Sequence, residues 1–273
     1  MELKHIAGRT YCCEVGAADV PIWMISDKQW ILIDTGTEKS PELSEYLLQN
    51  GITVRAIVQT HLHIDHIANN AELVQRFGCQ VFAAAEELPD AEFSGQHFDY
   101  PIITNLRDEE IVVDGNRFQT VFTPGHTLGH QMIITPDGVC CIGDVMMTLG
   151  RLKTAKIPFM RDVTMAIMSL ERVRETDYPY YIAAHRGMIP KEILSQTVDA
   201  NIEIELQLYD LLRKLVTEPI RQSDLEMKFM QAAGLTSKRV MAFRFMHITC
   251  EARIQELICA GELKASDGYI FPA

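Results

Sequence analysis

The residues best suited to chemistry lie in one short segment of the first third of the chain. It holds four side chains that can ligate a metal ion within six positions: His61, His63, Asp65 and His66. In an extended segment, residues two apart point the same way, so His61 and His63 can face one ion. Asp65 and His66 come at the turn into the next helix and face another direction. Imidazole together with carboxylate suits zinc, iron or manganese.

The plainer explanation is a polar loop that contains histidines by chance. Histidine makes up 9 of the 273 residues. Three histidines and one aspartate within six positions are improbable as a coincidence at that frequency. The segment therefore favours a metal site.

Three isolated residues further along the chain could supply the additional ligands that a site for two metal ions needs. Each stands where a predicted strand gives way to a loop, which is where rigid scaffolds display functional groups. They are His126 after the strand ending at Phe122, Asp144 after strand 139–142, and His185 after strand 180–184. Taken singly, each has a plainer explanation, because a lone histidine is more often structural and a lone aspartate more often belongs to a turn.

Together these motifs resemble the metallo-β-lactamase fold superfamily. The pattern HxHxDH at 61–66 precedes a lone His, a lone Asp and a lone His in that order. The segments TPGHT at 123–127 and IGD at 142–144 resemble the glyoxalase II-like and acyl-homoserine-lactonase-like branch. The resemblance covers roughly residues 3–190.

The resemblance implies two divalent metal ions, most often zinc, with iron or manganese as alternatives. It assigns His61, His63 and His126 to one ion and Asp65, His66 and His185 to the other, with Asp144 bridging them. Asp65 would also act in catalysis by orienting the nucleophile. Flavo-diiron members carry Glu at the position of His63, so histidine there favours hydrolysis over oxygen reduction.

This ligand set implies a binuclear hydrolase that cleaves a carboxylic ester, thioester or lactone of a small molecule through a hydroxide bridging the metals. Two features near Asp144 leave the substrate open. Met146 and Met147 either line an adaptable apolar pocket or only pack in a loop. Arg151, Lys153 and Lys156 either bind an anionic group or form a solvated face.

Two further polar residues have alternative roles. Asp34, in the sequence Asp-Thr-Gly at 34–36, either accepts a hydrogen bond from a ligand histidine or only caps its turn. His130, four residues after His126, is expected to be structural.

The elements that would position these residues form two successive β-rich halves, each with helices. In the first half, strands at 21–25, 30–34, 54–59 and 80–84 alternate with helices at 41–50 and 69–77. In the second, hairpins at 110–122 and 131–142 precede a helix at 164–174 and a strand at 180–184. This order predicts an α+β fold with two sheets rather than one parallel sheet. The resemblance makes it a four-layer αββα sandwich.

The pattern changes after Pro190, so we expect a hydrolase domain at 1–192 and a small helical C-terminal module at 193–273. Helices at 193–217, 223–233 and 237–260, followed by a hairpin at 263–271, resemble a winged helix. This module leaves open an alternative function, a metal-dependent nuclease or a nucleic-acid-binding regulator. The module has 9 basic and 11 acidic residues, so a role at the active-site entrance or in a homodimer is favoured.

Composition limits the functional class further. The net charge of −12 disfavours binding to phosphate backbones. No apolar run approaches the ~20 residues that a membrane span needs, and the first residues lack the pattern of a signal peptide, so we expect a cytoplasmic protein. The seven cysteines include no CxxC pair, which predicts reduced, mostly buried thiols.

Overall fold

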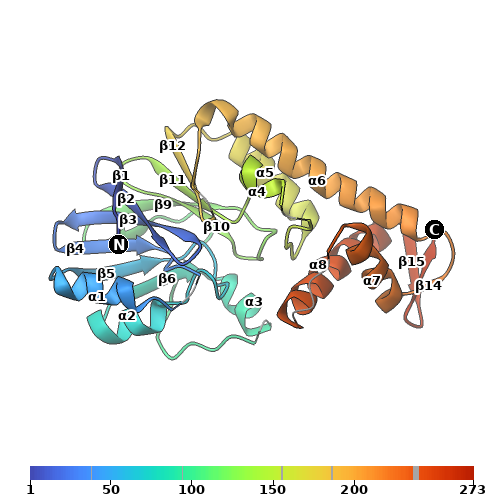
Figure 1. The fold of residues 1–273 in the computed structure, drawn as a ribbon, viewed down its shortest axis with the longest axis horizontal. Helices are drawn as coiled ribbons and strands as arrows, with labels where there is room; N and C mark the ends of the chain where they lie inside the picture. The colour runs from blue at the N-terminus through green and yellow to red at the C-terminus, as the bar shows by residue number, and fades with distance from the viewer. Residues whose placement is uncertain (38, 94, 155, 186, 236–239) are drawn as a thin grey trace.

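Two packed β-sheets form the centre of the first two thirds of the chain, and a helical module lies beside them (Figure 1). The structure is a computed structural model. It describes residues 1–37, 39–93, 95–154, 156–185, 187–235 and 240–273.

The first sheet has seven strands among the described residues, in the order in which they occur in the chain. Strands β1 to β4 pair antiparallel, whereas β4 to β7 are parallel to their neighbours. The strands are β1 (Lys4–Ala7), β2 (Thr10–Val15), β3 (Ala18–Ser26), β4 (Gln29–Ile33), β5 (Thr53–Val58), β6 (Gln80–Ala84) and β7 (Ile103–Asn105). Its helices are α1 (Pro41–Gln49), α2 (Asn70–Phe77) and α3 (Glu87–Phe93).

The second sheet has the order β13-β12-β11-β10-β9-β8 and is antiparallel except between β11 and β12. Its strands are β8 (Ile111–Val113), β9 (Asn116–Phe122), β10 (Gln131–Ile134), β11 (Val139–Gly143), β12 (Tyr180–Ala183) and β13 (Gly187–Ile189). Helices α4 (Leu149–Leu152) and α5 (Val163–Arg174) separate β11 from β12 in the chain.

Strand β4 shows why the layers form. Ile31 and Ile33 are buried among residues of both sheets, and the alternating Trp30 and Leu32 are buried with residues of α1 and α2. Side chains alternate between the two faces of a strand, so a strand covered on both faces is apolar throughout.

Strand β11 repeats this arrangement in the second sheet. Cys141 lies in the core between the sheets, and Cys140 packs with Leu170 of α5 and Val198 of the following helix. The adjacent cysteines thus fill two different cores as small apolar residues. Helices therefore cover the outer faces of both sheets, which confirms the predicted four-layer αββα fold.

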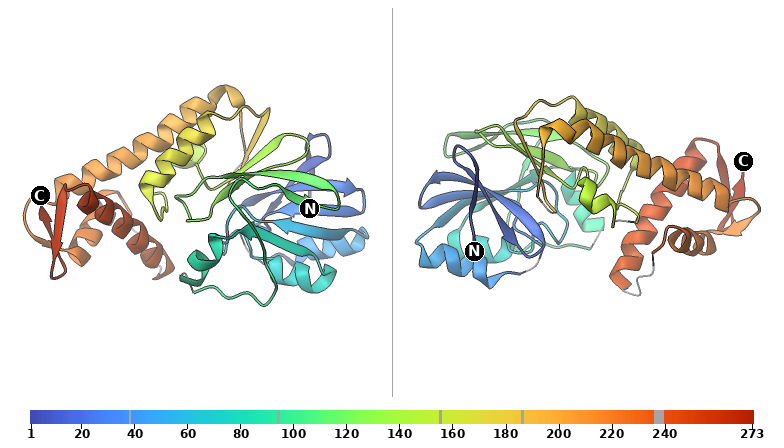
Figure 2. Two further views of the ribbon diagram at one scale, coloured as in Figure 1. Left: turned by 180° about the vertical axis from the view of Figure 1, so that it is seen from behind. Right: turned by 45° about the horizontal axis from the view of Figure 1, so that its top comes forward.

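The C-terminal module is joined to the sandwich by one long helix, α6 (Leu194–Leu215), which follows a short 3-10 turn (Lys191–Ile193). Figure 2 shows α6 running from the sandwich to the module in both views. The first half of α6, with Leu194 and Val198, packs on the second sheet. The second half, with Leu208 and Leu212, packs in the core of the module. The expected boundary at 192/193 stays a prediction.

The module's other elements are α7 (Gln222–Ala232), α8 (Val240–Cys259) and a three-stranded sheet, as far as the described residues show. The sheet has the order β14-β16-β15, formed by β14 (Ile220–Arg221), β15 (Leu263–Ser266) and β16 (Tyr269–Pro272). Three helices and a terminal hairpin agree with the expected elements, and the likeness to a winged helix stays a prediction. The expected start of the third helix at Ser237 lies outside the described residues.

Six of the seven cysteines are buried, as expected. Among the described residues, no helix combines the length and the apolar character that crossing a bilayer requires.

Candidate metal centre

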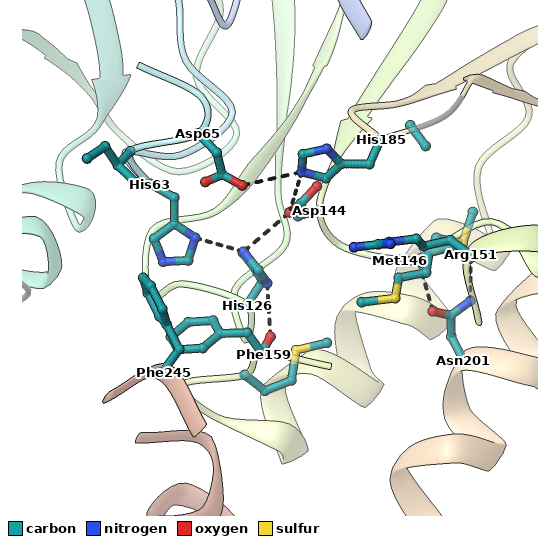
Figure 3. Close-up of a pocket in the computed structure, with 14 residues that line it drawn as sticks. His63, Asp65, His126, Asp144, Met146, Arg151, Phe159, His185, Asn201 and Phe245 are labelled. Atoms are coloured by element: carbon teal, nitrogen blue, oxygen red, sulfur yellow. Dashed lines mark hydrogen bonds and ion pairs between the residues drawn. The ribbon is translucent and has the colours of Figure 1, made fainter. Parts of the chain in front are cut away.

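The seven predicted ligands come together at one end of the two sheets. The 61–66 segment follows β5, and His126 follows β9. Asp144 comes directly after β11, and His185 comes two residues after the end of β12, which is parallel to β11. Adjacent parallel strands bring the residues after their carboxyl ends side by side. Figure 3 shows His63, Asp65, His126, Asp144 and His185 around one cavity.

Three imidazoles form the first ligand group. His63 Nδ1 lies 3.1 Å from His61 Nε2 and 2.9 Å from His126 Nε2. His126 Nδ1 donates to the carbonyl oxygen of Phe159 at 2.9 Å, so its Nε2 carries a lone pair. His61 Nδ1 lies 3.1 Å from the hydroxyl of Thr60, which donates its proton to Asp34. The hydroxyl can therefore only accept from His61 Nδ1–H, and His61 Nε2 also carries a lone pair.

This group fits a divalent cation. Lone pairs that face one another at about 3 Å repel unless a cation or proton lies between them. Tetrahedral zinc with Zn–N bonds of about 2.0–2.1 Å separates its ligand atoms by about 3.3 Å. Burial, together with neighbouring histidines, holds the pKa of His61 well below its usual value and lowers that of His63 to about 3. Both rings are therefore neutral, the state in which imidazole binds metals.

The second ligand group consists of Asp65, His66 and His185. His185 Nε2 lies 3.5 Å from Asp65 Oδ2. Among the described residues, the buried Nε2 of His66 has no hydrogen-bond partner, which is costly unless another group meets it. A metal ion would satisfy that nitrogen.

Asp144 lies between the two groups. Its Oδ2 is 3.6 Å from His126 Nε2, 3.6 Å from His66 Nε2 and 3.5 Å from His185 Nε2. One carboxylate oxygen therefore faces ligand atoms of both groups. Burial would raise the pKa of Asp144, but His66 and a hydrogen bond from His185 hold it well below its usual value, so the carboxylate is ionised.

The second group holds protons where a cation would bind. Burial opposes a charge on His66, but Asp34 and Asp144 raise its pKa well above the usual value. Burial likewise opposes a charge on His185, but hydrogen bonds to Asp144 and Asp65 raise its pKa to about 10. The positive charge of these imidazoliums balances the carboxylates, as a metal ion would.

Asp34 supports ligands of both groups. Its carboxylate accepts from Thr60 N at 2.8 Å, from the Thr60 hydroxyl at 2.7 Å and from His66 Nδ1 at 2.7 Å. It is buried and has a φ of 58°, in the left-handed region that Asp and Asn tolerate best among side-chain-bearing residues. Of the two roles considered for Asp34, the structure supports the hydrogen bond to a ligand histidine.

His130 has the structural role expected of it. Its Nε2 accepts from the backbone N–H of Asp144 at 3.0 Å, and its Nδ1 lies 2.9 Å from the Thr123 hydroxyl. It holds the backbone of the central carboxylate. Gly143 makes this contact feasible, because a Cβ there would lie 2.6 Å from His130 Nε2.

Glu87 is a positioning residue that the sequence did not reveal. It lies at the start of α3 and is 1% exposed. Its carboxylate accepts from Leu62 N at 2.7 Å, from Gly129 N at 3.0 Å and from the Thr127 hydroxyl. It thus joins the 61–66 segment to the loop of His126. Burial raises its pKa to about 7. No local motif marks it, since its partners lie 25 to 42 residues away.

A cavity of about 370 Å³ opens onto the ligands. Phe159 and Phe245 lie on one side of it, and Met146, Arg151 and Asn201 lie on another (Figure 3). The complete lining is His63, Ile64, Asp65, His126, Asp144, Met146, Met147, Arg151, Phe159, Met160, Ala183, His185, Asn201 and Phe245. Met146 and Met147 therefore line a pocket, which is the first of the two roles considered for them. Among the described residues, Arg151 is the one basic side chain of Lys or Arg that lines the cavity.

A profile of the family described as the metallo-beta-lactamase superfamily matches residues 15–185. The match covers more than half of the chain and includes all seven ligand candidates. The chain belongs to the metallo-β-lactamase superfamily. The family resemblance carried by the HxHxDH segment and the three later ligands is thereby confirmed.

Curated relatives match only part of this superfamily member. A hydroxyacylglutathione hydrolase of Vibrio campbellii (strain ATCC BAA-1116) is 36% identical over 134 residues, which is 47% of this chain and 48% of that protein. The chain thus spans about half the length of the first curated relatives it matches.

Solved structures resemble the whole chain. A metallo-beta-lactamase family protein from Thermus thermophilus superposes with a TM-score of 0.74 at 18% identity, over 97% of this chain and 98% of that one. A beta-lactamase domain protein from Burkholderia ambifaria gives a TM-score of 0.68 at 15% identity, over 100% and 94%. At these identities the likeness concerns the fold alone, and it extends through the C-terminal module.

Proposed function

We propose that this protein is a metal-dependent hydrolase that uses two divalent cations. Zinc is the first candidate, and iron and manganese are the alternatives. His61, His63 and His126 would hold one ion, Asp65, His66 and His185 would hold the other, and Asp144 would serve both. The observation that carries the proposal is Asp144 Oδ2, at 3.5–3.6 Å from ligand nitrogens of both groups.

The chemistry divides between the metals and the chain. Divalent cations supply Lewis acidity and lower the pKa of a water they bind, to roughly 7 for zinc. Asp65 is partly exposed to the cavity. Burial would raise its pKa, but a hydrogen bond from His185 lowers it to about 2. Its carboxylate therefore stays ionised and can accept a hydrogen bond from the attacking water, which orients that water.

The cavity favours a small substrate with an apolar acyl part. Met146, Met147, Met160, Phe159 and Phe245 supply flexible or aromatic surface next to the ligands. A carbonyl centre of a carboxylic ester, thioester or lactone suits this site. The hydroxyacylglutathione hydrolases among the relatives agree with such chemistry.

The alternative of a nuclease or nucleic-acid-binding regulator is less consistent with the contacts of the module. In a winged helix, the third helix is the one that enters the major groove of DNA. Here α8 faces the hydrolase domain instead, with Phe245 in the cavity and Thr249 bonded to Met160. The net charge of −12 also disfavours a phosphate backbone. A cytoplasmic location and a homodimer stay predictions.

A substrate panel tests the function. Purified protein is reconstituted with zinc, manganese or iron and assayed against thioesters, carboxylic esters, lactones, phosphodiesters and short RNA. We expect turnover of a carbonyl substrate. His61→Ala and Asp144→Asn should lower kcat/KM by more than about a hundredfold, because even residues outside the ligand shell contribute 10- to 100-fold.

His97→Ala is the matched control, because His97 is an exposed histidine that is not among the residues lining the cavity. It should retain wild-type turnover. Hydrolysis of the true substrate at the wild-type rate by folded His61→Ala and Asp144→Asn proteins would overturn the assignment. Turnover of RNA alone would replace it with the nuclease alternative.

A further inference from the structure

One ligand histidine is oriented by a backbone carbonyl that lies far from it in the chain. His126 Nδ1 donates to Phe159 O at 2.9 Å. A carbonyl only accepts, so this bond places the proton on Nδ1 and leaves Nε2 free to bind a metal. The position of Phe159 O therefore determines the tautomer and the direction of His126.

The C-terminal module holds both neighbours of Phe159. The Thr249 hydroxyl, on α8, accepts from Met160 N at 2.9 Å and donates to Pro158 O at 3.2 Å. Arg253, one turn further along α8, donates from Nη2 to Pro158 O at 3.4 Å and from Nη1 to the Thr249 hydroxyl at 2.6 Å. Two side chains of the module thus hold two successive peptide groups: the one that contains Phe159 O, through its N–H at Met160, and the one before it, through Pro158 O.

These two side chains are themselves fixed in the interior. Thr249 and Arg253 are both 0% exposed. The Arg253 guanidinium also pairs with Glu205 of α6, which is 1% exposed. Separating the two charges of a buried pair is costly, because each would be left uncompensated in the interior. The pair therefore holds the Arg253 side chain in place.

The segment 157–162, which connects α4 to α5, is otherwise packed into the module. Ile157 and Met160 are buried in one cluster with residues of α6, α7 and α8. Glu256 of α8 accepts from Val163 N at 2.7 Å and from the Thr164 hydroxyl at 2.7 Å. Its negative charge at the first turn of α5 is favourable for that helix.

The same segment also contacts the loop of His126 directly. Gly125 O accepts from Arg161 N at 2.7 Å and from Asp162 N at 3.1 Å. The loop that carries the ligand is therefore bound to segment 157–162 at two points, and that segment is bound to α8. In Figure 3, Phe159 lies between His126 and Phe245 of α8.

We propose that the C-terminal module is part of the metal centre: Thr249 and Arg253 act as positioning residues that hold Phe159 O against His126 and so set the affinity of the three-histidine site. The inference rests on the proposed function, because it takes His126 as a metal ligand. It goes beyond that function by assigning the module a defined action on one of the two metal sites.

The test removes one hydroxyl and restores it. Thr249→Val keeps the shape of the side chain but deletes the bonds of the hydroxyl to Pro158, Met160 and Arg253, and Thr249→Ser returns the hydroxyl. Thr164→Val is the matched control, because it deletes a hydroxyl bond to Glu256 between α5 and α8 without touching residues 158–160. Arg253→Lys is a second variant, should Thr249→Val not fold.

Two readouts are measured on each full-length variant. Competition with a chelator gives the affinity for each of two zinc ions. Spectra of the metal-free protein labelled with ¹⁵N-histidine give the tautomer of His126. We expect Thr249→Val and Arg253→Lys to weaken one zinc site about tenfold, to leave the other unchanged, and to mix the tautomers of His126. Thr249→Ser and Thr164→Val should resemble wild type.

The outcomes separate this proposal from the proposed function. If His126→Ala binds two zinc ions as tightly as wild type, the ligand assignment itself fails. If His126→Ala loses one ion while folded Thr249→Val and Arg253→Lys keep wild-type affinity and a single His126 tautomer, only the action of the module on the metal site is overturned.

Discussion

At the scale of single residues, the site depends on partners that fix the protonation and direction of several candidate ligands. Asp34 illustrates this best, since one carboxylate orients His66 directly and His61 through the Thr60 hydroxyl. Its φ of 58° is a strained conformation for a residue with a side chain, and such strain is common at functional sites.

Replacement of Asp34 by Asn should weaken metal binding and leave the fold intact. Asn tolerates a positive φ, but its amide cannot accept from Thr60 and His66 at both oxygens, so affinity should fall about 10- to 100-fold. Chelator competition measures the change. Asp114→Asn is the control, because Asp114 also has a positive φ of 48° but pairs with Arg55 at the surface. Equal affinities for the two variants would contradict this role of Asp34.

Metal binding should release protons and become tighter as the pH rises. In the metal-free protein the pKa of His185 is raised to about 10 and that of His66 lies well above its usual value. Both rings therefore hold protons near neutral pH, and a metal must displace them. Each displaced proton makes the apparent affinity rise about tenfold per pH unit below the pKa of its ring.

Calorimetric titration in buffers of different ionisation enthalpy measures this release. The observed heat should vary with the buffer for wild-type protein and vary less for His185→Gln, which has one proton fewer to displace. Heats independent of the buffer would show that the imidazoles are already deprotonated.

At the scale of secondary-structure elements, the sequence predicted the strands that carry ligands better than the elements that support them. Strands β4, β5, β11 and β12 are mainly buried apolar runs and β9 alternates buried with more exposed residues, and a periodicity argument detects both patterns. The sequence did not predict strands β1, β2, β7, β13 and β14 or helices α3 and α4. Helix α3 is short and acidic and contains Pro89, so nothing local distinguishes it from a loop.

The same contrast holds for the site. The candidate ligands could be named because imidazole and carboxylate in a fixed order are a specific pattern, to which the family resemblance added the proposed assignment to each ion. Glu87, Thr249 and Arg253 could not, because each acts through hydrogen bonds to distant backbone groups. Such bonds leave no periodic or compositional trace.

The end of β11 is an element whose backbone limits the site. Gly143 has a φ of 54°, and a Cβ there would lie 2.6 Å from His130 Nε2 and 2.9 Å from Thr60. Gly143→Ala should therefore destabilise the fold by about 1–3 kcal/mol and weaken metal binding through Asp144.

Gly138→Ala separates the two causes. Gly138 also has a positive φ, of 77°, but the nearest atom to a Cβ there is 3.9 Å away. Thermal unfolding of the two metal-free variants should show a larger loss for Gly143→Ala, and only that variant should bind metal less tightly. Equal losses would mean that backbone strain alone accounts for the effect.

At the scale of the whole molecule, the sandwich and the C-terminal module share one helix and one active-site wall. Helix α6 packs on the second sheet with its first half and on α7 and α8 with its second half. Phe245 of α8 and Asn201 of α6 both line the cavity. The module thus forms part of the cavity wall, which agrees with the expected role at the active-site entrance, and its description as a separate domain stays a prediction.

The most direct test of the account counts metal ions per chain. Protein equilibrated with zinc and freed of excess by dialysis is analysed by mass spectrometry for metal and protein, for wild type and Asp144→Asn, with His97→Ala as the control. We predict two zinc ions per chain in wild type and in His97→Ala, and a loss of affinity at both sites in Asp144→Asn, because Asp144 Oδ2 faces both ligand groups. One ion or none in wild type, or two ions at wild-type affinity in Asp144→Asn, would contradict the shared two-metal centre.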